Sequence, residues 1–472
     1  MGFYRPVAAF KHVLPLLCTG LFLVQFAYTL SDVPSIKLLQ DIICKDQYSF
    51  VQSDVLMPES TCSGEAVQRR LNMISVGMAV AATTAGALAS IPFGILGDRI
   101  GRLPVLAMSL LGMVLSLGYS IYVIKQRGRI PLEALWASGI PILLGGGRGV
   151  VEAMVFAMVS DVTAASHTNQ RPTRRAAAFQ CVVASVLLGQ LVGQLLSAVF
   201  MKRSIWLPIY LSLSIAVLAS LFLVIATPET CQRYNIKHCV STTSHSDDVP
   251  RRRTLRALFS RPTAWLLPGT LLVMPVATMQ SGILLQAMHV LFEWPLEHSG
   301  LLLGLRTLVT LATLLLLLPC LYWLYSKKFP GSESTRRDLT LARLSALLFM
   351  FGSLCLLMVN DEPLVVTGVC ISALGSGVPA LSRSLLSTFL HEHQTGFLFG
   401  VLAVGEVLGM LASQLGMGWL FDIGLQVWPG LPFCPALVVA VGLTLALYIV
   451  QASAAQEPNE LDVAVWEPRR IC

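Results

Sequence analysis

The chain has 472 residues, of which 55% are hydrophobic and only 12% are charged, and its mean hydropathy is +0.70. A soluble globular protein of this length would carry about 25% charged residues, so that class is excluded. The net charge of +7 does not indicate a nucleic-acid partner, because lysine and arginine are expected to gather on one side of a membrane protein. The composition therefore predicts an integral membrane protein.

Twelve apolar runs have about the 20 residues that a helix needs to cross a bilayer. The runs are continuously apolar and do not alternate, which favours helices over barrel strands. We expect the first run to be a helix that ends near Leu30 and is not a cleaved leader, since no small-residue cleavage site precedes Ser31. The runs begin near Val13, Met73, Leu103, Leu132, Ala177, Ile205, Trp265, Leu301, Ala342, Leu364, Phe397 and Phe433.

The loops differ in their content of lysine and arginine. With the N-terminus inside, most of the 33 basic residues fall in the predicted inner segments. By the positive-inside rule, both termini are predicted to be cytoplasmic. The plasma membrane is the default location, with a vacuolar or vesicular membrane as the alternative.

The order of spans predicts two six-helix bundles joined by a polar linker. The linker contains the basic stretch RRRTLRALF, which either lies on anionic lipid headgroups or is simply solvated. The predicted parts are a first bundle at 1–226, a cytoplasmic linker at 227–262, a second bundle at 263–452 and a cytoplasmic tail at 453–472.

The two halves of the sequence resemble each other. The stretch 144–147, Leu-Gly-Gly-Gly, matches 374–377, Leu-Gly-Ser-Gly, in the corresponding run of the second half. Further matches are Phe179 with Phe399, Gly189 with Gly409, Gln194 with Gln414 and Leu195 with Leu415. A parallel repeat of two six-helix units is an architecture of secondary transporters. The fold class we expect is an all-α membrane protein of twelve helices in two pseudo-symmetric bundles.

Between the second and third runs lies GILGDRIGRLPVL, residues 94–106. Glycines at 97 and 101 suit a tight turn, Asp98 can accept hydrogen bonds from a helix N-terminus or an arginine, and Arg99 and Arg102 add basic charge. The stretch resembles the loop signature of the major facilitator superfamily, which Gly94, Leu96, Asp98, Arg99, Gly101 and Arg102 match. Leu103 departs from that signature. The resemblance implies a conformational latch between helix ends, formed by Gly94, Asp98, Arg99, Gly101 and Arg102.

Other stretches resemble one branch of that superfamily. TPET at 227–230, LLGGGRGVVEAM and LGSGVPALSRSLL are similar to fungal metabolite-cluster transporters, and more distantly to the proton-coupled folate transporter group. The folate group carries an acidic residue on its fifth helix where this chain has Ser185. Proton coupling through that position is therefore not implied here.

Five ionisable residues fall inside predicted spans: Arg148, Glu152, Arg306, Arg383 and Glu406. A charge in the hydrocarbon region costs at least about 2.5–3.5 kcal/mol, so each is expected to face a partner or a cavity. Snorkelling to the membrane surface explains Arg383, whereas Arg306 lies deeper. These five are the candidate substrate or coupling residues.

Arg148 and Glu152 are four residues apart and share one helix face. They either form a self-neutralising pair or take part in transport. The glycines at 145–147 favour the second interpretation, since they permit close helix approach or local unwinding that an ion pair does not need. The resemblance adds that helices one, four, seven and ten line the central cavity of facilitators.

Glu406 has no acidic counterpart at Val186, its repeat mate. A lone carboxylate in a membrane helix is expected to hold a proton part of the time, as a coupling site requires. The alternative is a neutral glutamic acid hydrogen-bonded to Arg383 or Arg306. Three amides, Gln190, Gln194 and Gln280, are cavity candidates, with hydrogen bonding between helices as the other possible role.

The remaining chemistry is sparse. Cys44 and Cys62 share one outer segment and are either bridged or free. His391 and His393 flank Glu392, but no further metal ligand stands near them, and the chain has no phosphate-binding G-x-x-x-x-G-K motif. We therefore expect no metal and no cofactor, and a proton gradient as the energy source.

Together these features predict a secondary transporter that works by alternating access. The fungal resemblance implies proton-coupled efflux of a small amphipathic secondary metabolite. The alternative is proton-coupled uptake of an organic anion or nutrient, and a receptor or scaffold without transport is a third reading. An enzyme is not expected, because no nucleophile and base occur at one depth. The expected partners are the lipid bilayer and a small-molecule substrate, with the chain as a monomer.

Overall fold

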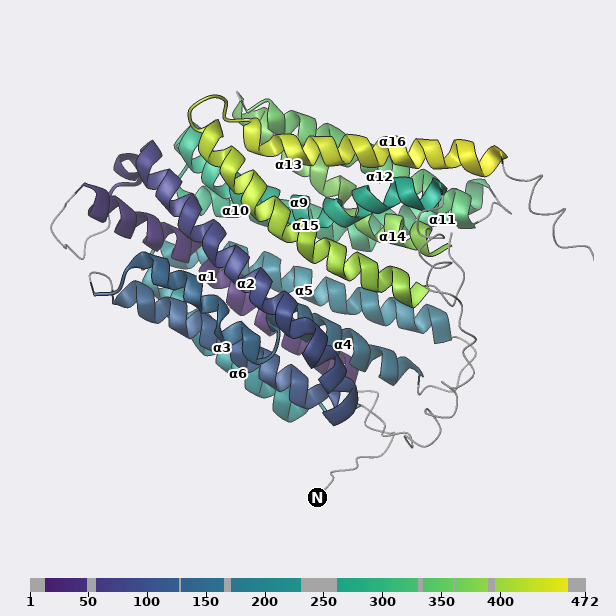
Figure 1. The fold of residues 1–472 in the computed structure, drawn as a ribbon, viewed down its shortest axis with the longest axis horizontal. Helices are drawn as coiled ribbons and strands as arrows, with labels where there is room; N and C mark the ends of the chain where they lie inside the picture. Colours follow the sequence, from purple (N-terminus) through teal and green to yellow (C-terminus); the bar gives the residue numbers. More distant parts are fainter. Residues whose placement is uncertain are drawn as a thin grey trace, which may run out of the picture. The chain divides into compact units, whose positions relative to one another are not determined.

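The computed structural model describes residues 13–48, 57–126, 129–164, 171–230, 261–329, 334–359, 361–388 and 395–456. Twelve helical stretches within them are long and apolar enough to cross a membrane, which confirms the predicted all-helical fold class (Figure 1). The RRRTLRALF stretch of the linker, the His391–His393 triplet and the tail from residue 457 lie outside the described residues.

The chain divides into two compact units. The first takes in the described residues of Met1–Tyr234, Ser281–Leu311 and Gln414–Pro429. Its helices are α1 Val13–Gln47, η2 Glu59–Cys62, α2 Glu65–Ile100, α3 Arg102–Lys125, η3 Leu132–Gly139, η4 Pro141–Leu144, α4 Gly147–Ala164, α5 Arg171–Met201 and α6 Trp206–Ala226. To these it adds the last part of α9 (Arg261–Phe292), α10 (Leu296–Ala312) and the end of α15 (Thr395–Gly424).

The second unit holds the rest of the described chain, from Asn235–Gln280, Ala312–Ser413 and Gly430–Cys472. Besides the first part of α9 and most of α15, its elements are the π-helical turn η6 Thr313–Leu317, α11 Leu318–Lys328, α12 Ser334–Leu357, α13 Glu362–Leu374, η7 Gly375–Gly377, α14 Val378–Thr388, η9 Leu431–Phe433 and α16 Cys434–Gln456. Two segments of the second half of the sequence thus belong to the first unit. The division into halves at residues 226 and 263 stays a prediction.

Each unit has its own apolar core. In the first, α1 packs along α5 and α6. Leu17 of α1, Leu110 of α3 and Leu223 of α6 are almost fully buried there. In the second, α12 packs against α13, α14 and α16 around Phe349 and Leu447. These side chains are apolar because each helix of a bundle buries one apolar face against its neighbours.

The fourth and tenth spans, Leu132–Val162 and Glu362–Leu386, are both interrupted near their middle. In span four the 3-10 helices η3 and η4 give way to α4 at residues 145–147, where Gly146 and Gly147 have φ of +85° and +62°. In span ten the interruption is the 3-10 turn η7 between α13 and α14. Both interruptions fall on the repeated glycine motif, so the α-helix is broken at this motif in both repeats, by positive-φ glycines in span four and by a tighter 3-10 turn in span ten.

The same glycines bring neighbouring helices close together. A Cβ added at Gly145 would overlap the backbone of Ser109 on α3. A Cβ added at Gly375 would lie 2.6 Å from the backbone nitrogen of Phe349 on α12. Only glycine allows such a backbone approach, so the first glycine of each motif serves helix packing.

Candidate functional site

Arg148 and Glu152 lie directly after the interruption of span four. Arg148 occupies the first turn of α4, at the middle of the span, and its Nε is 2.9 Å from the Glu152 carboxylate. The two side chains are 59% and 43% exposed, so the pair is not enclosed by the first unit. An exposed ion pair at this depth is stable only where water, substrate or protein can solvate it, because lipid cannot.

A third charge, Asp32, joins this pair. Asp32 lies near the middle of α1, is exposed, and interacts electrostatically with Arg148. The sequence prediction missed it because the first helix was expected to end near Leu30, whereas α1 continues to Gln47. The apolar spacing of Val33, Ile36 and Leu39 beyond Asp32 was the signal for that continuation. We call Asp32, Arg148 and Glu152 the α1/α4 charge group.

The α1/α4 charge group holds two carboxylates and one guanidinium. Arg148 can neutralise one carboxylate, so the group favours binding either a proton or a cationic partner for the second. The interruption also leaves the first N–H groups of α4 without helical partners at mid-span, beside Arg148. Such an N-terminus favours a negative charge nearby. Arg148 can thus change its ion-pair partner when one of the two carboxylates takes up a proton.

The second unit has a simpler arrangement. Arg383 of α14 and Glu406 of α15 form an ion pair through Nη2 and Oε1, with the side chains 36% and 24% exposed. Glu406 is therefore not a lone carboxylate, and Arg383 is engaged with it rather than directed only to the surface. Of the two partners that the sequence offered for a neutral Glu406, the structure has Arg383, and the contact is an ion pair.

The three amides and Arg306 have different surroundings. Gln194 of α5 accepts a hydrogen bond of 2.9 Å from Thr307 of α10, so it connects two helices. Gln280 is only 2% exposed on α9, and among the described residues neither its amide nitrogen nor its oxygen has a hydrogen-bond partner. Gln190 and Arg306 are half-buried on α5 and α10. Of the amides, Gln280 has the strongest need for a partner such as substrate or water.

The loop signature lies at the junction of α2 and α3. Gly94, Asp98 and Arg99 belong to the end of α2, and the turn itself is the single residue Gly101, whose φ of +116° favours glycine. Arg102 forms an ion pair of 3.0 Å with Asp161 near the end of α4. Asp98 and Arg99 are exposed. Of the predicted latch charges, Arg102 is the one whose ion pair joins helix ends among the described residues of the first unit.

Two carboxylates that the sequence prediction missed, those of Glu229 and Asp161, form hydrogen bonds or ion pairs at this junction. The Glu229 carboxylate accepts hydrogen bonds of 3.0 Å from the backbone N–H groups of Arg102 and Leu103, which caps the N-terminus of α3. Thr230 donates a longer hydrogen bond of 3.4 Å to Asp161. The TPET stretch after α6 is therefore tied to the α2–α3 turn.

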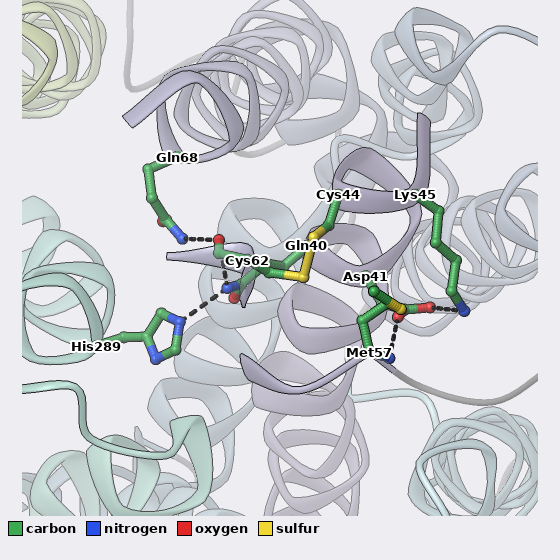
Figure 2. The surroundings of a disulfide bond; sticks show 8 residues. All are labelled: Gln40, Asp41, Cys44, Lys45, Met57, Cys62, Gln68 and His289. Carbon is green, nitrogen blue, oxygen red and sulfur yellow. Dashed lines mark hydrogen bonds and ion pairs between the residues drawn. A yellow bond between two sulfur atoms is a disulfide. The ribbon is translucent and has the colours of Figure 1, made fainter. Parts of the chain in front are cut away.

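At the other end of the first unit, Cys44 of α1 and Cys62 of η2 are joined by a disulfide (Figure 2). The backbone oxygen of Cys62 accepts hydrogen bonds of 3.1 and 3.2 Å from the side chains of Gln40 and Gln68. Both hydrogen bonds are drawn in Figure 2. The Gln40 nitrogen also lies 2.8 Å from Nε2 of His289 on α9. The bridge is thus the centre of a polar network.

Twelve spanning helices, interrupted repeats and charges at mid-span define a multi-pass membrane protein with the architecture of a secondary transporter. Residues 65–334 match the Major Facilitator Superfamily, and the chain belongs to this family of transporters, which are not enzymes. An integral membrane location and a small-molecule substrate follow from that membership.

Relatives and solved structures agree with this assignment. The chain is 27% identical to the MFS efflux pump atnC of Emericella nidulans, over 92% of this chain and 87% of that one. It is 24% identical to the proton-coupled folate transporter of Bos taurus, over 76% and 73% of the two chains. The crystal structure of a D-xylose-proton symporter superposes with a TM-score of 0.63 at 15% identity, covering 93% and 96% of the chains, which shows a shared fold.

Proposed function

We propose that this protein is a proton-coupled efflux transporter for a small amphipathic organic compound. In this proposal it works by alternating access between two six-helix bundles, with both termini in the cytoplasm, most simply at the plasma membrane. The relatives named as efflux pumps support the direction, because their similarity extends over most of the chain. The substrate class rests on the resemblance of the sequence to fungal metabolite-cluster transporters.

The α1/α4 charge group is the observation that carries the coupling. Asp32 and Arg148 lie at the middle of their spans, where an unsolvated charge is unfavourable by about 2.5–3.5 kcal/mol or more. Two acids share one base, so a proton taken up by Asp32 or Glu152 releases Arg148 from that partner. A conformational step that depends on this exchange links proton movement to substrate movement.

Uptake of an organic anion is the second candidate. The broken span four places Arg148 in the first turn of α4, and both the arginine and a helix N-terminus favour a negatively charged ligand. In that case the substrate anion would take the place of one carboxylate beside Arg148. The two candidates therefore differ in the charge of the substrate and in the direction of transport.

Reconstitution into proteoliposomes under an imposed pH gradient of either sign distinguishes the candidates. The panel contains rhodamine 6G as an amphipathic cation, carboxyfluorescein as an organic anion, and a mixture of fungal secondary metabolites read by mass spectrometry. Gradient-driven expulsion of an amphipathic compound supports efflux, and accumulation of the anion supports uptake. Movement of no compound by correctly inserted protein would contradict both and favour a receptor or scaffold.

A further inference from the structure

Helix α11 of the second unit exposes a face that is apolar at one end and basic at the other. Cys320, Leu324 and Lys327 follow one another at a spacing of three or four residues, so they share a helix face. All three are exposed, and so is Trp323, at 61%. Leu316, one turn earlier, is 70% exposed. We call these five residues the α11 stripe. Span eight ends at Lys328, so the stripe runs from the membrane interior to the membrane surface.

Two lysines lie at the basic end of the stripe, each beside an aromatic ring. The Nζ of Lys327 is 5.1 Å from the centre of the Trp323 ring, and the Nζ of Lys328 is 5.8 Å from that of Phe329. Among the described residues, neither lysine has a carboxylate partner. A ring attracts a cation without neutralising it, and exposed tryptophans of membrane proteins lie at the level of the lipid headgroups. The end of α11 therefore holds two uncompensated positive charges at that level.

The start of α12 adds a third basic side chain, because Arg336 is exposed. The neighbouring acid, Asp338, does not offset these charges at the surface, since it is only 8% exposed. Its carboxylate accepts hydrogen bonds of 3.2 and 3.1 Å from Tyr322 of α11 and Ser384 of α14. Arg337 is also close to it, with 3.7 Å between Nε and Oδ1. Asp338 is thus occupied inside the unit, and the lysines face outward.

The charge of the whole turn favours an anionic partner. Residues 327–338 include four basic and two acidic residues, one of which, Glu333, lies outside the described residues. The turn is one of the predicted inner segments, and the cytoplasmic leaflet carries anionic lipids. A soluble anion would use the lysines and leave the apolar part of the stripe without a role. A phospholipid matches both parts, with an acyl chain for the apolar side chains and a phosphate for the ammonium groups.

We propose that the end of α11 is a binding site for an anionic phospholipid. Lys327 and Lys328 bind the headgroup, with Arg336 adding to the attraction, and one acyl chain lies along Trp323 and Leu316. The site goes beyond the proposed transport function and is the same for efflux and for uptake. A lipid bound there fixes the depth of α11 in the membrane, because the headgroup stays at the membrane surface.

Photolabelling of the full-length protein in phosphatidylcholine vesicles tests this. The vesicles contain a small fraction of either phosphatidylserine or phosphatidylcholine with a photoreactive diazirine on the acyl chain, and the labelled residues are identified by mass spectrometry. Each basic residue near an anionic lipid contributes about fivefold in affinity, so we expect the serine lipid to label residues 313–329 about fivefold or more above the choline lipid. In the double variant Lys327→Gln with Lys328→Gln, this excess should disappear.

Two further variants separate the site from general effects of charge and folding. Lys327→Arg with Lys328→Arg keeps both charges and should keep the excess. Lys202→Gln with Arg203→Gln, the matched control, removes an exposed adjacent basic pair between α5 and α6 and should leave the excess at residues 313–329 unchanged. Labelling of the other helices by the choline lipid shows that each variant is folded and inserted.

Three outcomes would overturn the lipid site. One is equal labelling of residues 313–329 by the two lipids in the wild type, which would mean that α11 contacts bulk lipid without preference. Another is an excess that survives in the double glutamine variant. The third is loss of the excess with inorganic phosphate but not with sodium chloride of equal ionic strength, which would indicate a site for a free anion. The labelling needs no transported compound, so its result is independent of the proposed function.

Discussion

Span four and span ten are interrupted at matching glycines, yet the two interruptions differ in backbone and in charge. Gly146 and Gly147 adopt positive φ in span four, whereas η7 is a regular 3-10 turn that contains Ser376. Arg148 follows its interruption at once and pairs along its own helix. Arg383 comes six residues after Gly377 and pairs with Glu406 on another helix.

The comparison distinguishes features that both bundles share from features that only one of them has. The shared glycines give each repeat a close helix contact and a break, which two similar bundles both need. The charges are not shared: the first unit has a second carboxylate, Asp32, beside its arginine, and the Arg383–Glu406 pair is balanced. We therefore propose that transport coupling belongs to the first unit and that the pair in the second unit has a structural role.

The largest expected effect is that of Asp32→Asn. Removing the carboxylate leaves Arg148 with Glu152 and no second acid to exchange with, so pH-gradient-driven movement of a transported panel compound should fall to background. Exchange of the same compound across the membrane without a gradient should persist, since binding and the conformational change are retained. Measuring both in proteoliposomes checks this, and gradient-driven transport at the wild-type rate would remove Asp32 from the mechanism.

Next come the packing glycines, which should behave alike in the two units. Gly145→Ala and Gly375→Ala each place a methyl group against a neighbouring backbone, and overpacking of this kind destabilises by about 1–3 kcal/mol. Thermal unfolding in detergent measures the loss. Gly149→Ala is the matched control, because nothing lies within 4 Å of its Cβ position. If only one of the two variants has a lower unfolding temperature, the two glycines do not have the same packing role in the repeats.

The Arg383–Glu406 pair should matter for stability rather than coupling. Arg383→Leu leaves Glu406 without its partner and should destabilise the protein by about 2 kcal/mol, less than a fully buried pair because both side chains are partly exposed. Adding Glu406→Leu should restore most of the unfolding temperature. If the double variant is folded but loses gradient-driven transport, the pair takes part in coupling after all.

The smallest effect concerns the middle residue of each motif. Gly146→Ser forces a side chain into a left-handed backbone, at a cost of about 1–2 kcal/mol. Ser376→Gly, the reciprocal change, should lower stability by about 1 kcal/mol or less, through backbone entropy alone. Unfolding temperatures of the two variants side by side give the comparison. Equal losses of unfolding temperature would contradict a difference in backbone conformation between the two interruptions.

The sequence was sufficient for the twelve spans, because hydropathy is a local property. Helical spacing placed Arg148 and Glu152 on one face but left open whether they pair. The sequence also left the Cys44–Cys62 bridge open, which the structure contains. Asp32 was missed because a polar stretch hid the continuation of α1. The ion-pair partners of Glu406 and Arg102 could not be predicted from the sequence, because Arg383 and Asp161 approach them only through tertiary packing.

The central claim is that protons move through the α1/α4 charge group and not through Glu406. A pH-sensitive dye trapped in proteoliposomes reports proton movement when a transported compound of the panel is added. We expect proton movement with wild-type protein and with Glu406→Gln, and none with Asp32→Asn although that variant still exchanges the compound. Proton movement that persists in Asp32→Asn and disappears in Glu406→Gln would contradict the account.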